Sequence, residues 1–167
     1  MKKILLISDT HGFLDPRLLK HIEWADEIWH AGDIGNAAVL HALEDMKPVR
    51  AVYGNIDGTE VRKMCPLDQH FVCEGLEVWI THIGGYPGKY EKRVLAQFMN
   101  HRPGIFICGH SHILKVIYDK AHDLLHINPG AAGNHGIHRV VTAIRMEIDQ
   151  GKVKDLSIVE WPRKGLA

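Results

Sequence analysis

Seven side chains of metal-binding type stand where short apolar runs of the sequence end. They are Asp9, His11, Asp33, Asn55, His82, His110 and His112. Because the strands of a parallel α/β sheet end at one edge, residues spread over roughly a hundred positions can converge there. Carboxylate, amide and imidazole ligands together suit Mn, Fe, Zn or Ni. The sequence therefore predicts a metal site.

Two pairs of these residues are separated by a single position. The pairs are Asp9 with His11 and His110 with His112. Side chains at positions i and i+2 leaving an extended strand point to the same side, so each pair is expected to address a common centre. A glycine directly precedes three of the seven residues, as expected where the backbone turns tightly or comes close to a bound group.

The number of ligands exceeds what one ion needs. Two ions roughly 3.5–4 Å apart, bridged by one carboxylate, would use all of them. The set contains no cysteine, which argues against a structural zinc site. Cys65, Cys73 and Cys108 show no CxxC spacing and fit a reducing compartment, so they receive no metal role. The cluster is interpreted as a catalytic binuclear centre.

Short runs rich in Ile and Val carry these residues and are predicted to be buried strands. They span residues 3–8, 27–31, 49–53, 77–82 and 105–108. Helical patterns are predicted over residues 15–25, 36–46 and 87–103. This alternation favours a largely parallel sheet in the first part of the chain. His30 lies inside one of the runs and is interpreted as a packed strand histidine.

After His112 the pattern changes to strands joined by short polar turns. The apolar stretches are residues 114–119, 124–130, 139–149 and 152–161. Such a pattern is typical of antiparallel strands, and the simplest assembly is a second sheet packed on the first with helices outside. We predict an α/β fold, a two-sheet β-sandwich flanked by helices in four αββα layers, formed by a single domain over residues 1–167.

The charge composition narrows the class of partner. Twenty basic and twenty acidic residues cancel, so no excess of positive charge argues for holding a nucleic-acid backbone. The apolar run near the N-terminus breaks at Asp9 and is too short for a signal peptide. No stretch approaches the roughly 18 apolar residues of a membrane span. We expect a cytoplasmic protein with no membrane partner.

The chain resembles the calcineurin-like metallophosphoesterases in an ordered set of motifs. These are Asp9-x-His11, Gly32-Asp33, Gly54-Asn55, His82 and Gly109-His110-Ser111-His112. The motifs cover residues 9–112, and the β-rich remainder is similar to the second sheet of that fold. The length of the chain, and Ile56 and Asp57 after Asn55, resemble a small phosphodiesterase branch of bacteria and archaea, related to a eukaryotic vacuolar-sorting scaffold subunit.

The resemblance implies a role for each of the seven residues. Asp9, His11 and His112 would bind a first ion. Asn55, His82 and His110 would bind a second, with Asp33 bridging both. Asp33, Asn55 and His82 are also predicted to be catalytic. The implied cofactors are two divalent ions, Mn²⁺ first, with Zn²⁺, Fe²⁺ and Ni²⁺ as alternatives. Such ions turn a bridging water into a hydroxide that attacks phosphorus, so no protein nucleophile is required.

Two departures from the family pattern concern the substrate. Larger members carry a histidine after the Asn that can protonate the leaving oxygen, and here Ile56 occupies that position. A general acid typically contributes 10²–10⁴-fold, so its loss should favour good leaving groups. The second departure lies in residues 127–139, where two alanines follow Pro-Gly. Asp57, His135 and His138 are candidate acids or substrate contacts, although a glycine-rich turn that only caps strands explains residues 127–139 equally well.

The leading hypothesis is a binuclear-metal-dependent phosphodiesterase that acts on a small phosphate ester. One alternative is a non-catalytic metal-binding scaffold, which would be expected to lack ligands. The other is a nuclease of the same superfamily, and the neutral charge and the lack of a basic, aromatic-lined groove weigh against long nucleic acids. Cyclic nucleotides and dinucleotides stay candidates. Apolar surface around Trp161 is a candidate contact for a homo-oligomer.

Overall fold

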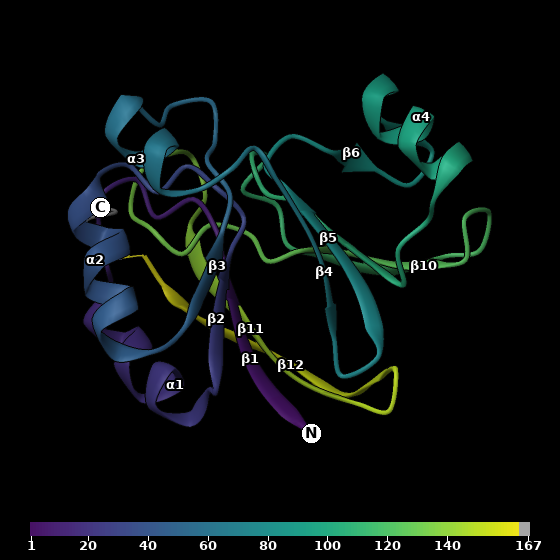
Figure 1. Ribbon diagram of the computed structural model, residues 1–167. Helices are drawn as coiled ribbons and strands as arrows, with labels where there is room; N and C mark the ends of the chain where they lie inside the picture. The colour runs from purple at the N-terminus through teal and green to yellow at the C-terminus, as the bar shows by residue number, and fades with distance from the viewer. Residues whose placement is uncertain (164–167) are drawn as a thin grey trace.

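The sheets of this protein are each built on three parallel strands with antiparallel strands added beside them. A computed structural model describes residues 1–163 and contains two five-stranded sheets packed face to face (Figure 1). The first sheet has the order β12-β11-β1-β2-β3, with bounds Lys152–Pro162, Val140–Asp149, Lys2–Ile7, Glu27–His30 and Val49–Ala51. The second has the order β4-β5-β8-β10-β9, with bounds Asp68–Cys73, Leu76–Thr81, Ile105–Ile107, Leu124–Asn128 and Lys115–Asp119. The predicted two-sheet α/β fold is confirmed.

Apolar side chains on both faces of the central strands hold the layers together. In β1, Ile4 and Leu6 pack between the sheets with Trp29, whereas Leu5 and Ile7 pack against the helical side. Strands buried on both faces require this continuous apolar sequence instead of an alternation of apolar and polar residues. The second sheet packs an aromatic cluster that includes Trp79 against the helix α4 (Lys92–Asn100).

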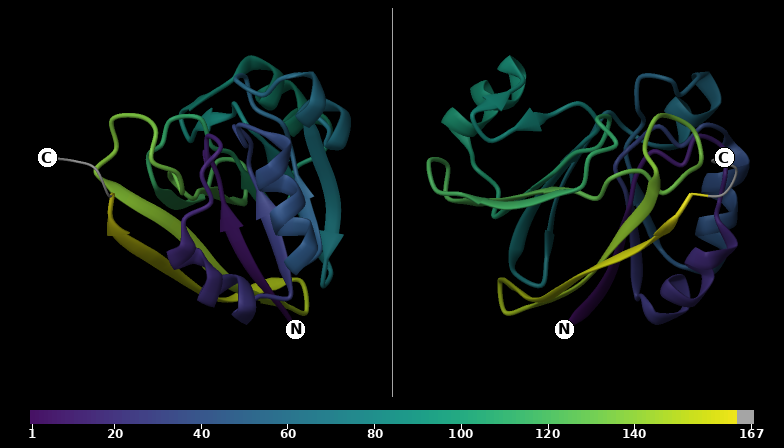
Figure 2. Two further views of the ribbon diagram at one scale, coloured as in Figure 1. Left: turned by 90° about the vertical axis from the view of Figure 1, so that its left-hand side faces the viewer. Right: turned by 180° about the vertical axis from the view of Figure 1, so that it is seen from behind.

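Helices cover the outer face of each sheet. They are η1 (Pro16–Leu18), α1 (Leu19–Trp24), α2 (Ala37–Met46), α3 (Thr59–Met64) and α4 (Lys92–Asn100). Figure 2 shows α1 and α2 along the first sheet, and α4 beyond the second. Asn36 caps α2 as predicted, because its side chain accepts a hydrogen bond from the Val39 N–H at 3.1 Å. No helix of residues 1–163 is long and apolar enough to cross a membrane.

The helix predicted over residues 87–103 is wrong in its first turn. Residues Gly85–Tyr86 (β6) and Lys89–Tyr90 (β7) form a small hairpin, and the helix begins only at Lys92. Gly88 lies in the turn with φ +88°, a left-handed conformation that ends any helical pattern locally. The short helix α3 and the strand β4 were not predicted.

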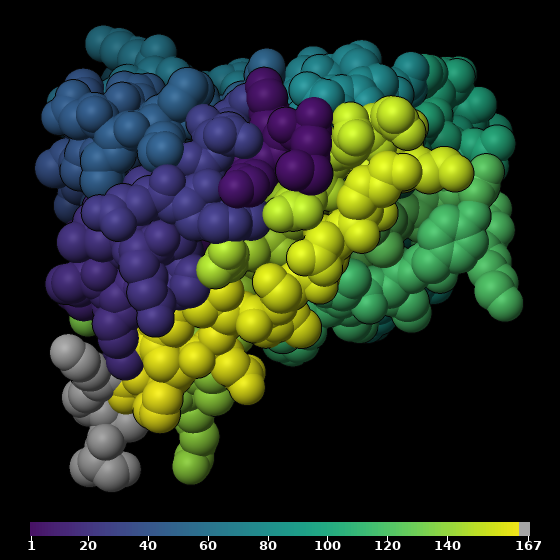
Figure 3. All heavy atoms as spheres, turned by 90° about the horizontal axis from the view of Figure 1, so that it is seen from below, coloured from purple at the N-terminus to yellow at the C-terminus, as the bar shows by residue number. Residues whose placement is uncertain are grey.

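The strands after His112 do not form a sheet of their own, which corrects the predicted division of strands. β11 pairs with β1 in antiparallel register, and β10 joins β8 in parallel. In Figure 3, seen from below, the yellow β12 crosses the molecule between the purple-to-blue half and the green half. Local periodicity identifies a strand but contains no information about its partner, so the sequence pattern could not assign strands to sheets.

His30 is packed in the core as predicted and is completely buried. Its Nδ1 accepts a hydrogen bond from the Gly32 N–H at 3.1 Å, and its Nε2 lies 2.9 Å from the Thr10 hydroxyl. Nε2 therefore carries the proton and donates to Thr10. Burial lowers the pKa of His30 to about 4, so the ring is neutral at pH 7.

We expect the stability of the metal-free protein to fall as the pH drops from about 6.5 to about 4. The unfolded chain binds a proton at His30 below its ordinary pKa, whereas the folded protein does not, so protonation favours unfolding by roughly 3 kcal/mol at the lower pH. Urea denaturation in EDTA at several pH values measures this loss. His30→Gln should flatten the curve, while His41→Gln at an exposed position should not. Parallel curves for His30→Gln and the wild type would contradict the assignment.

Candidate metal centre

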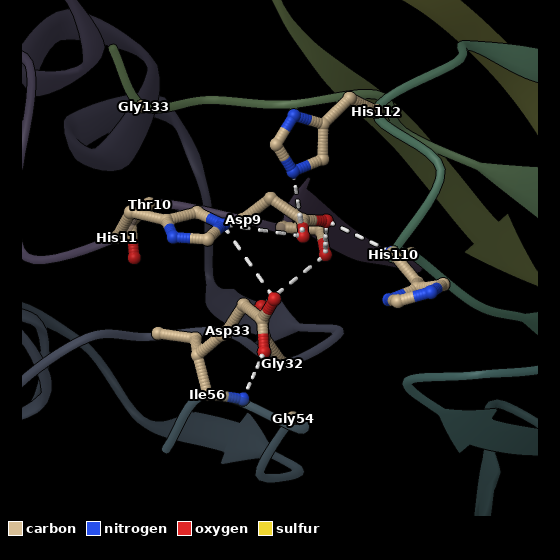
Figure 4. A network of polar contacts seen from close by, with 12 residues as sticks. Asp9, Thr10, His11, Gly32, Asp33, Gly54, Ile56, His110, His112 and Gly133 are labelled. Carbon is tan, nitrogen blue, oxygen red and sulfur yellow. Dashed lines mark hydrogen bonds and ion pairs between the residues drawn. The ribbon is translucent and has the colours of Figure 1, made fainter. Parts of the chain in front are cut away.

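Six of the seven predicted residues form two neighbouring groups at the carboxyl ends of the strands. The groups are Asp9, His11 and His112, and Asp33, His82 and His110. Within each group, one candidate ligand atom from every residue lies within 4.8 Å of the others. Figure 4 shows the side chains of Asp9, His11, Asp33 and His112 turned toward a common space. The seventh residue, Asn55, lies beside the second group, with its Oδ1 3.0 Å from Nδ1 of His110.

Asp33 joins the two groups. Its Oδ2 lies 3.5 Å from Nε2 of His11 in the first group and 3.2 Å from Nε2 of His82 in the second. Its Oδ1 accepts a hydrogen bond from the Ile56 N–H at 3.1 Å. One carboxylate oxygen is thus fixed by the protein, and the other faces an imidazole of each group. This is the position that a bridging ligand needs.

Asp9 divides its two oxygens in the same way. Its Oδ2 accepts hydrogen bonds from the Ser8 hydroxyl at 2.6 Å and from the His110 N–H at 3.1 Å. Its Oδ1 is buried without a hydrogen-bond partner among the described residues and lies 3.2 Å from Nε2 of His112. Ser8 was not among the predicted residues, because a serine before an aspartate is not a pattern specific to any site.

The imidazole ring of His82 faces the centre through one defined nitrogen. Its Nδ1 lies 2.7 Å from the Ala31 carbonyl, so Nδ1 carries the proton and donates it. In the neutral ring, Nε2 then has only a lone pair, yet it lies 3.2 Å from the Asp33 carboxylate. Two such acceptors repel each other unless a cation or a proton lies between them.

Buried atoms without partners support a cation at this place. They include Nε2 of His11 and Nε2 of His82 as well as Oδ1 of Asp9. A buried polar atom without a partner costs about 1–3 kcal/mol, so such atoms rarely gather without a function. The residues therefore fit divalent metal ions by donor type, by burial and by their unused lone pairs.

The carboxylates of the centre are held in the charged form that metal binding requires. Burial alone would raise the pKa of Asp9, but the neighbouring His11 and His112 outweigh it and lower that pKa well below its usual range. For Asp33, burial is likewise outweighed, chiefly by His82, and the pKa is lowered. In the metal-free protein, the same carboxylates raise the pKa of His82 against the effect of its burial. Metal binding should therefore release protons.

The backbone at the centre is left-handed at several non-glycine residues. The values of φ are 54° at Asp9, 47° at His11, 54° at Asp33, 72° at His110 and 63° at His112. Such conformations cost energy and persist where the surroundings enforce them, often at functional sites. Backbone hydrogen bonds from the Asp9 N–H to the Gly32 carbonyl and from the His11 N–H to the Asp33 carbonyl hold the loops together.

This geometry corrects the argument from i, i+2 spacing. Asp9 and His11 do share a group, but His110 and His112 belong to different groups, as the resemblance implied and contrary to the expectation from spacing alone. The residues lie beyond the ends of β1 and β8 and are not extended. The conformation of each loop therefore sets the direction of its side chains, and the alternation of side chains along a strand does not apply to them.

Two glycines stand where any side chain would collide with the carboxylates. A Cβ at Gly54 would overlap Oδ1 of Asp33, and one at Gly109 would overlap the Ser8 hydroxyl and Oδ2 of Asp9. The sequence predicted that the backbone comes close to a bound group at these glycines. In the structure, the backbone instead comes close to the residues that face the centre.

Asp57 lies apart from the centre and holds two loops. Its carboxylate accepts hydrogen bonds from the N–H groups of Ile34 at 3.1 Å, Gly35 at 2.8 Å and Gly54 at 2.8 Å. The residue is 3% exposed. Because both oxygens are occupied by backbone, Asp57 has a structural position, which disagrees with its interpretation as an acid or a substrate contact.

The structure brings the other two candidates, His135 and His138, to the first group. His135 is exposed and stacks on His11, with 4.8 Å between ring centroids. His138 lies with Nε2 2.8 Å from the Gly133 carbonyl and with Nδ1 3.3 Å from Nδ1 of His112. Nε2 of His138 must donate, so its Nδ1 accepts a hydrogen bond from the Nδ1–H of His112. The contact leaves Nε2 of His112 with a lone pair toward Asp9.

His138→Ala should weaken metal binding about 10- to 100-fold, because Nδ1 of His112 loses the acceptor that fixes its tautomer. Calorimetric titration of the metal-free protein with Mn²⁺ or Zn²⁺ measures the change, and nitrogen chemical shifts report the tautomer of His112 directly. Ile137→Ala, at a neighbouring residue that is 98% exposed, serves as the control. An unchanged affinity together with an unchanged tautomer in His138→Ala would refute the role.

Comparisons with known proteins show the family and the fold of the chain. A protein of Mycoplasma pneumoniae named probable metallophosphoesterase is 28% identical over 171 residues, which cover 98% of this chain and 99% of the relative. Vps29 of Entamoeba histolytica complexed with Zn²⁺ has a TM-score of 0.73 at 15% identity and covers 97% of this chain and 99% of its own. An archaeal phosphodiesterase has a TM-score of 0.68 at 21% identity, covering 94% and 99%. The family model for the calcineurin-like phosphoesterase superfamily domain matches residues 1–151, and the chain belongs to that superfamily.

Proposed function

We propose that the protein hydrolyses small phosphodiesters with two divalent metal ions. Asp9, His11 and His112 would hold one ion, and Asn55, His82 and His110 the other, with Asp33 shared. The observation that carries the proposal is the place of the free Asp33 oxygen, 3.5 Å from His11 and 3.2 Å from His82. Bound ions of this kind supply an activated water and neutralise charge on the phosphoryl oxygens.

Mn²⁺ is the proposed ion. A mixed set of carboxylate, amide and imidazole ligands supports Mn²⁺, and it also suits Zn²⁺, Fe²⁺ and Ni²⁺. Zn²⁺ is bound in the Vps29 structure from Entamoeba histolytica. The complete set of seven ligands favours an enzyme over a non-catalytic scaffold.

Two arginines beside the second group suit an anionic substrate. Arg62 and Arg93 line a pocket of about 270 Å³ together with Asn55 and His82. Arg62 is held by the Asp57 carbonyl, and Arg93 by the Asp68 carboxylate at 3.1 Å. Guanidinium groups fixed in this way can pair with phosphate oxygens while the metal ligands bind the ions.

Charge and cysteine chemistry support the remaining parts of the proposal. Equal numbers of acidic and basic residues favour a small substrate over a long nucleic acid. Cys65, Cys73 and Cys108 are free and buried, which favours a reducing, cytoplasmic location. Trp161 packs on Arg17, and its indole N–H donates a hydrogen bond to Asp15. The apolar surface around it is the proposed contact of a homo-oligomer.

Asp33→Ala and Asp33→Asn should each lower hydrolysis of bis(p-nitrophenyl) phosphate by at least about 10³-fold, because each removes the charge shared by both ions. Steady-state assays with added Mn²⁺ measure the rate, and metal analysis shows how many ions stay bound. Asp155→Asn, at an exposed carboxylate near the start of β12, is the matched control. Retention of most activity in Asp33→Ala would exclude the shared ligand.

We expect the rate to depend steeply on the leaving group. Ile56 stands where larger relatives have an acid, and the Asp57 carboxylate is occupied by backbone N–H groups. A poor leaving group then departs without protonation, so the rate should fall by about 10²–10⁴-fold between p-nitrophenyl and alkyl diesters beyond their intrinsic difference. A series of aryl and alkyl methylphosphates measures the slope. A shallow slope in the wild type that becomes steeper in His135→Ala would identify His135 as the acid. A shallow slope in both proteins would contradict the expectation that the leaving group departs without protonation.

A further inference from the structure

A second and larger pocket opens from the other side of His110. Its volume is about 430 Å³, and its lining includes Ser111 and His110, the second of which also belongs to the second ligand group. Ile83, Tyr86 and Ile113 contribute apolar surface to it. Tyr86 and Ile113 are 44% and 63% exposed, so they are accessible to a ligand. A group esterified to a phosphate at the centre would extend into this pocket.

The pocket contains a buried side chain whose polar atoms have no partner. His126, on β10, lines the pocket and is 1% exposed, and neither of its ring nitrogens has a hydrogen-bond partner among the described residues. Its ring packs near Tyr90 and Phe106, at 5.7 and 5.9 Å between centroids. A core position here would be filled better by an apolar ring, because a buried donor and acceptor without partners are costly. A ligand that hydrogen-bonds to the imidazole would remove that cost.

Burial keeps this imidazole neutral at physiological pH. The pKa of His126 is lowered to about 4, first by burial and then by the nearby charge of Lys115. The ring therefore offers one N–H donor and one acceptor nitrogen. Such a group can hydrogen-bond to the polar edge of a heterocycle, where donors and acceptors lie side by side.

Other polar groups of the pocket are already fixed by the fold. The Asn128 side-chain amide donates to the Gly109 carbonyl at 3.0 Å and to the Ser111 hydroxyl oxygen at 3.1 Å. The same oxygen accepts from the Ile113 N–H at 3.2 Å. Asn128 thus holds the wall beside His110 in place, and the Ser111 hydroxyl proton stays available to a ligand.

The charges of the pocket argue against a second phosphate group in it. Lys115 lies with its ammonium 4.3 Å from the centroid of the Tyr86 ring, and the Glu91 carboxylate lines the same pocket. One positive and one negative charge leave no net attraction for an anion. The aromatic wall and the polar histidine instead suit a neutral, flat ring with hydrogen-bonding edges.

Building on the proposed phosphodiesterase function, we propose that this pocket binds a heteroaromatic base, so that the substrates are phosphodiesters in which one ester group is a nucleoside. Tyr86 stacks on the base, and His126 hydrogen-bonds to its edge. Aromatic stacking tolerates every base, so the pocket selects for the presence of a base and only weakly for its kind.

The test compares two ligands that differ only in the base. Adenosine 5′-monophosphate and ribose 5-phosphate are titrated calorimetrically into the metal-loaded wild-type protein at saturating metal. We expect the nucleotide to bind at least about tenfold more tightly, which is the contribution of one stacked base. Tyr86→Ala and His126→Leu should each reduce the ratio to about threefold or less without changing the affinity for ribose 5-phosphate.

Matched variants distinguish the pocket from general effects. Tyr86→Phe keeps the ring and should keep the preference. Leu67→Ala alters the pocket beside Arg62 and should leave the ratio unchanged. Because Tyr86 is partly exposed, Tyr86→Ala tests the proposal even if His126→Leu fails to fold.

The outcomes separate this proposal from the general function. Equal binding of the two ligands by wild-type protein that hydrolyses bis(p-nitrophenyl) phosphate would overturn the base pocket and leave the phosphodiesterase intact. Tighter binding of hexyl phosphate than of the nucleotide would also overturn it, in favour of an aliphatic group. A preference for the nucleotide that Tyr86→Ala abolishes would support the pocket even in a protein with no diester hydrolysis, which would refute only the proposed reaction.

Discussion

Two buried, ionised carboxylates set the requirements for the rest of the structure. Asp9 is completely buried and Asp33 is 3% exposed, and charged groups in such surroundings need compensation. The protein supplies a hydroxyl, backbone N–H groups and imidazoles. One oxygen of each carboxylate is satisfied in this way, and the other is turned toward histidines with free lone pairs. Divalent ions satisfy this arrangement better than protons do, because one ion can bind a carboxylate oxygen and several imidazole lone pairs at once.

The fold makes this arrangement rigid by bringing loops from both sheets to one edge. β1 and β2 run parallel in the first sheet, and β5 and β8 in the second. Their carboxyl ends therefore lie on the same side of the sandwich, and the apolar layer between the sheets fixes the distance between them. Left-handed residues after β1, β2 and β8 then turn the side chains inward. Strain of this kind is tolerable because the strands that carry it are fully packed.

The two pockets beside the second group suggest how one site could treat the two ends of a substrate differently. The pocket with Arg62 and Arg93 presents positive charge near Asn55 and His82. The pocket with Tyr86 and His126 presents aromatic and neutral polar surface on the other side of His110. A substrate with an anionic phosphoryl group and a flat neutral ring matches this division. In the proposed function, the candidate metal centre would supply the reaction, and the loops around it would select the substrate.

The sequence by itself determined which residues face the centre and which strands carry them. Seven residues of metal-binding type at the ends of apolar runs were visible because polar termination of a buried strand is a local pattern. The packed state of His30 and the cap at Asn36 were also local. Asp57 was misinterpreted because its carboxylate is occupied by the backbone N–H groups of Ile34 and Gly35, which are distant in sequence, and of Gly54.

Only the tertiary structure decided which strands pair and what surrounds the ligands. The assignment of β10 and β11 to different sheets and the contact of His138 with His112 depend on loops with left-handed residues and on contacts between distant segments. The position of His126 in a pocket beside the centre likewise depends on contacts between distant segments. Patterns of 2.0 or 3.6 residues describe one element at a time, whereas these features arise where several elements meet.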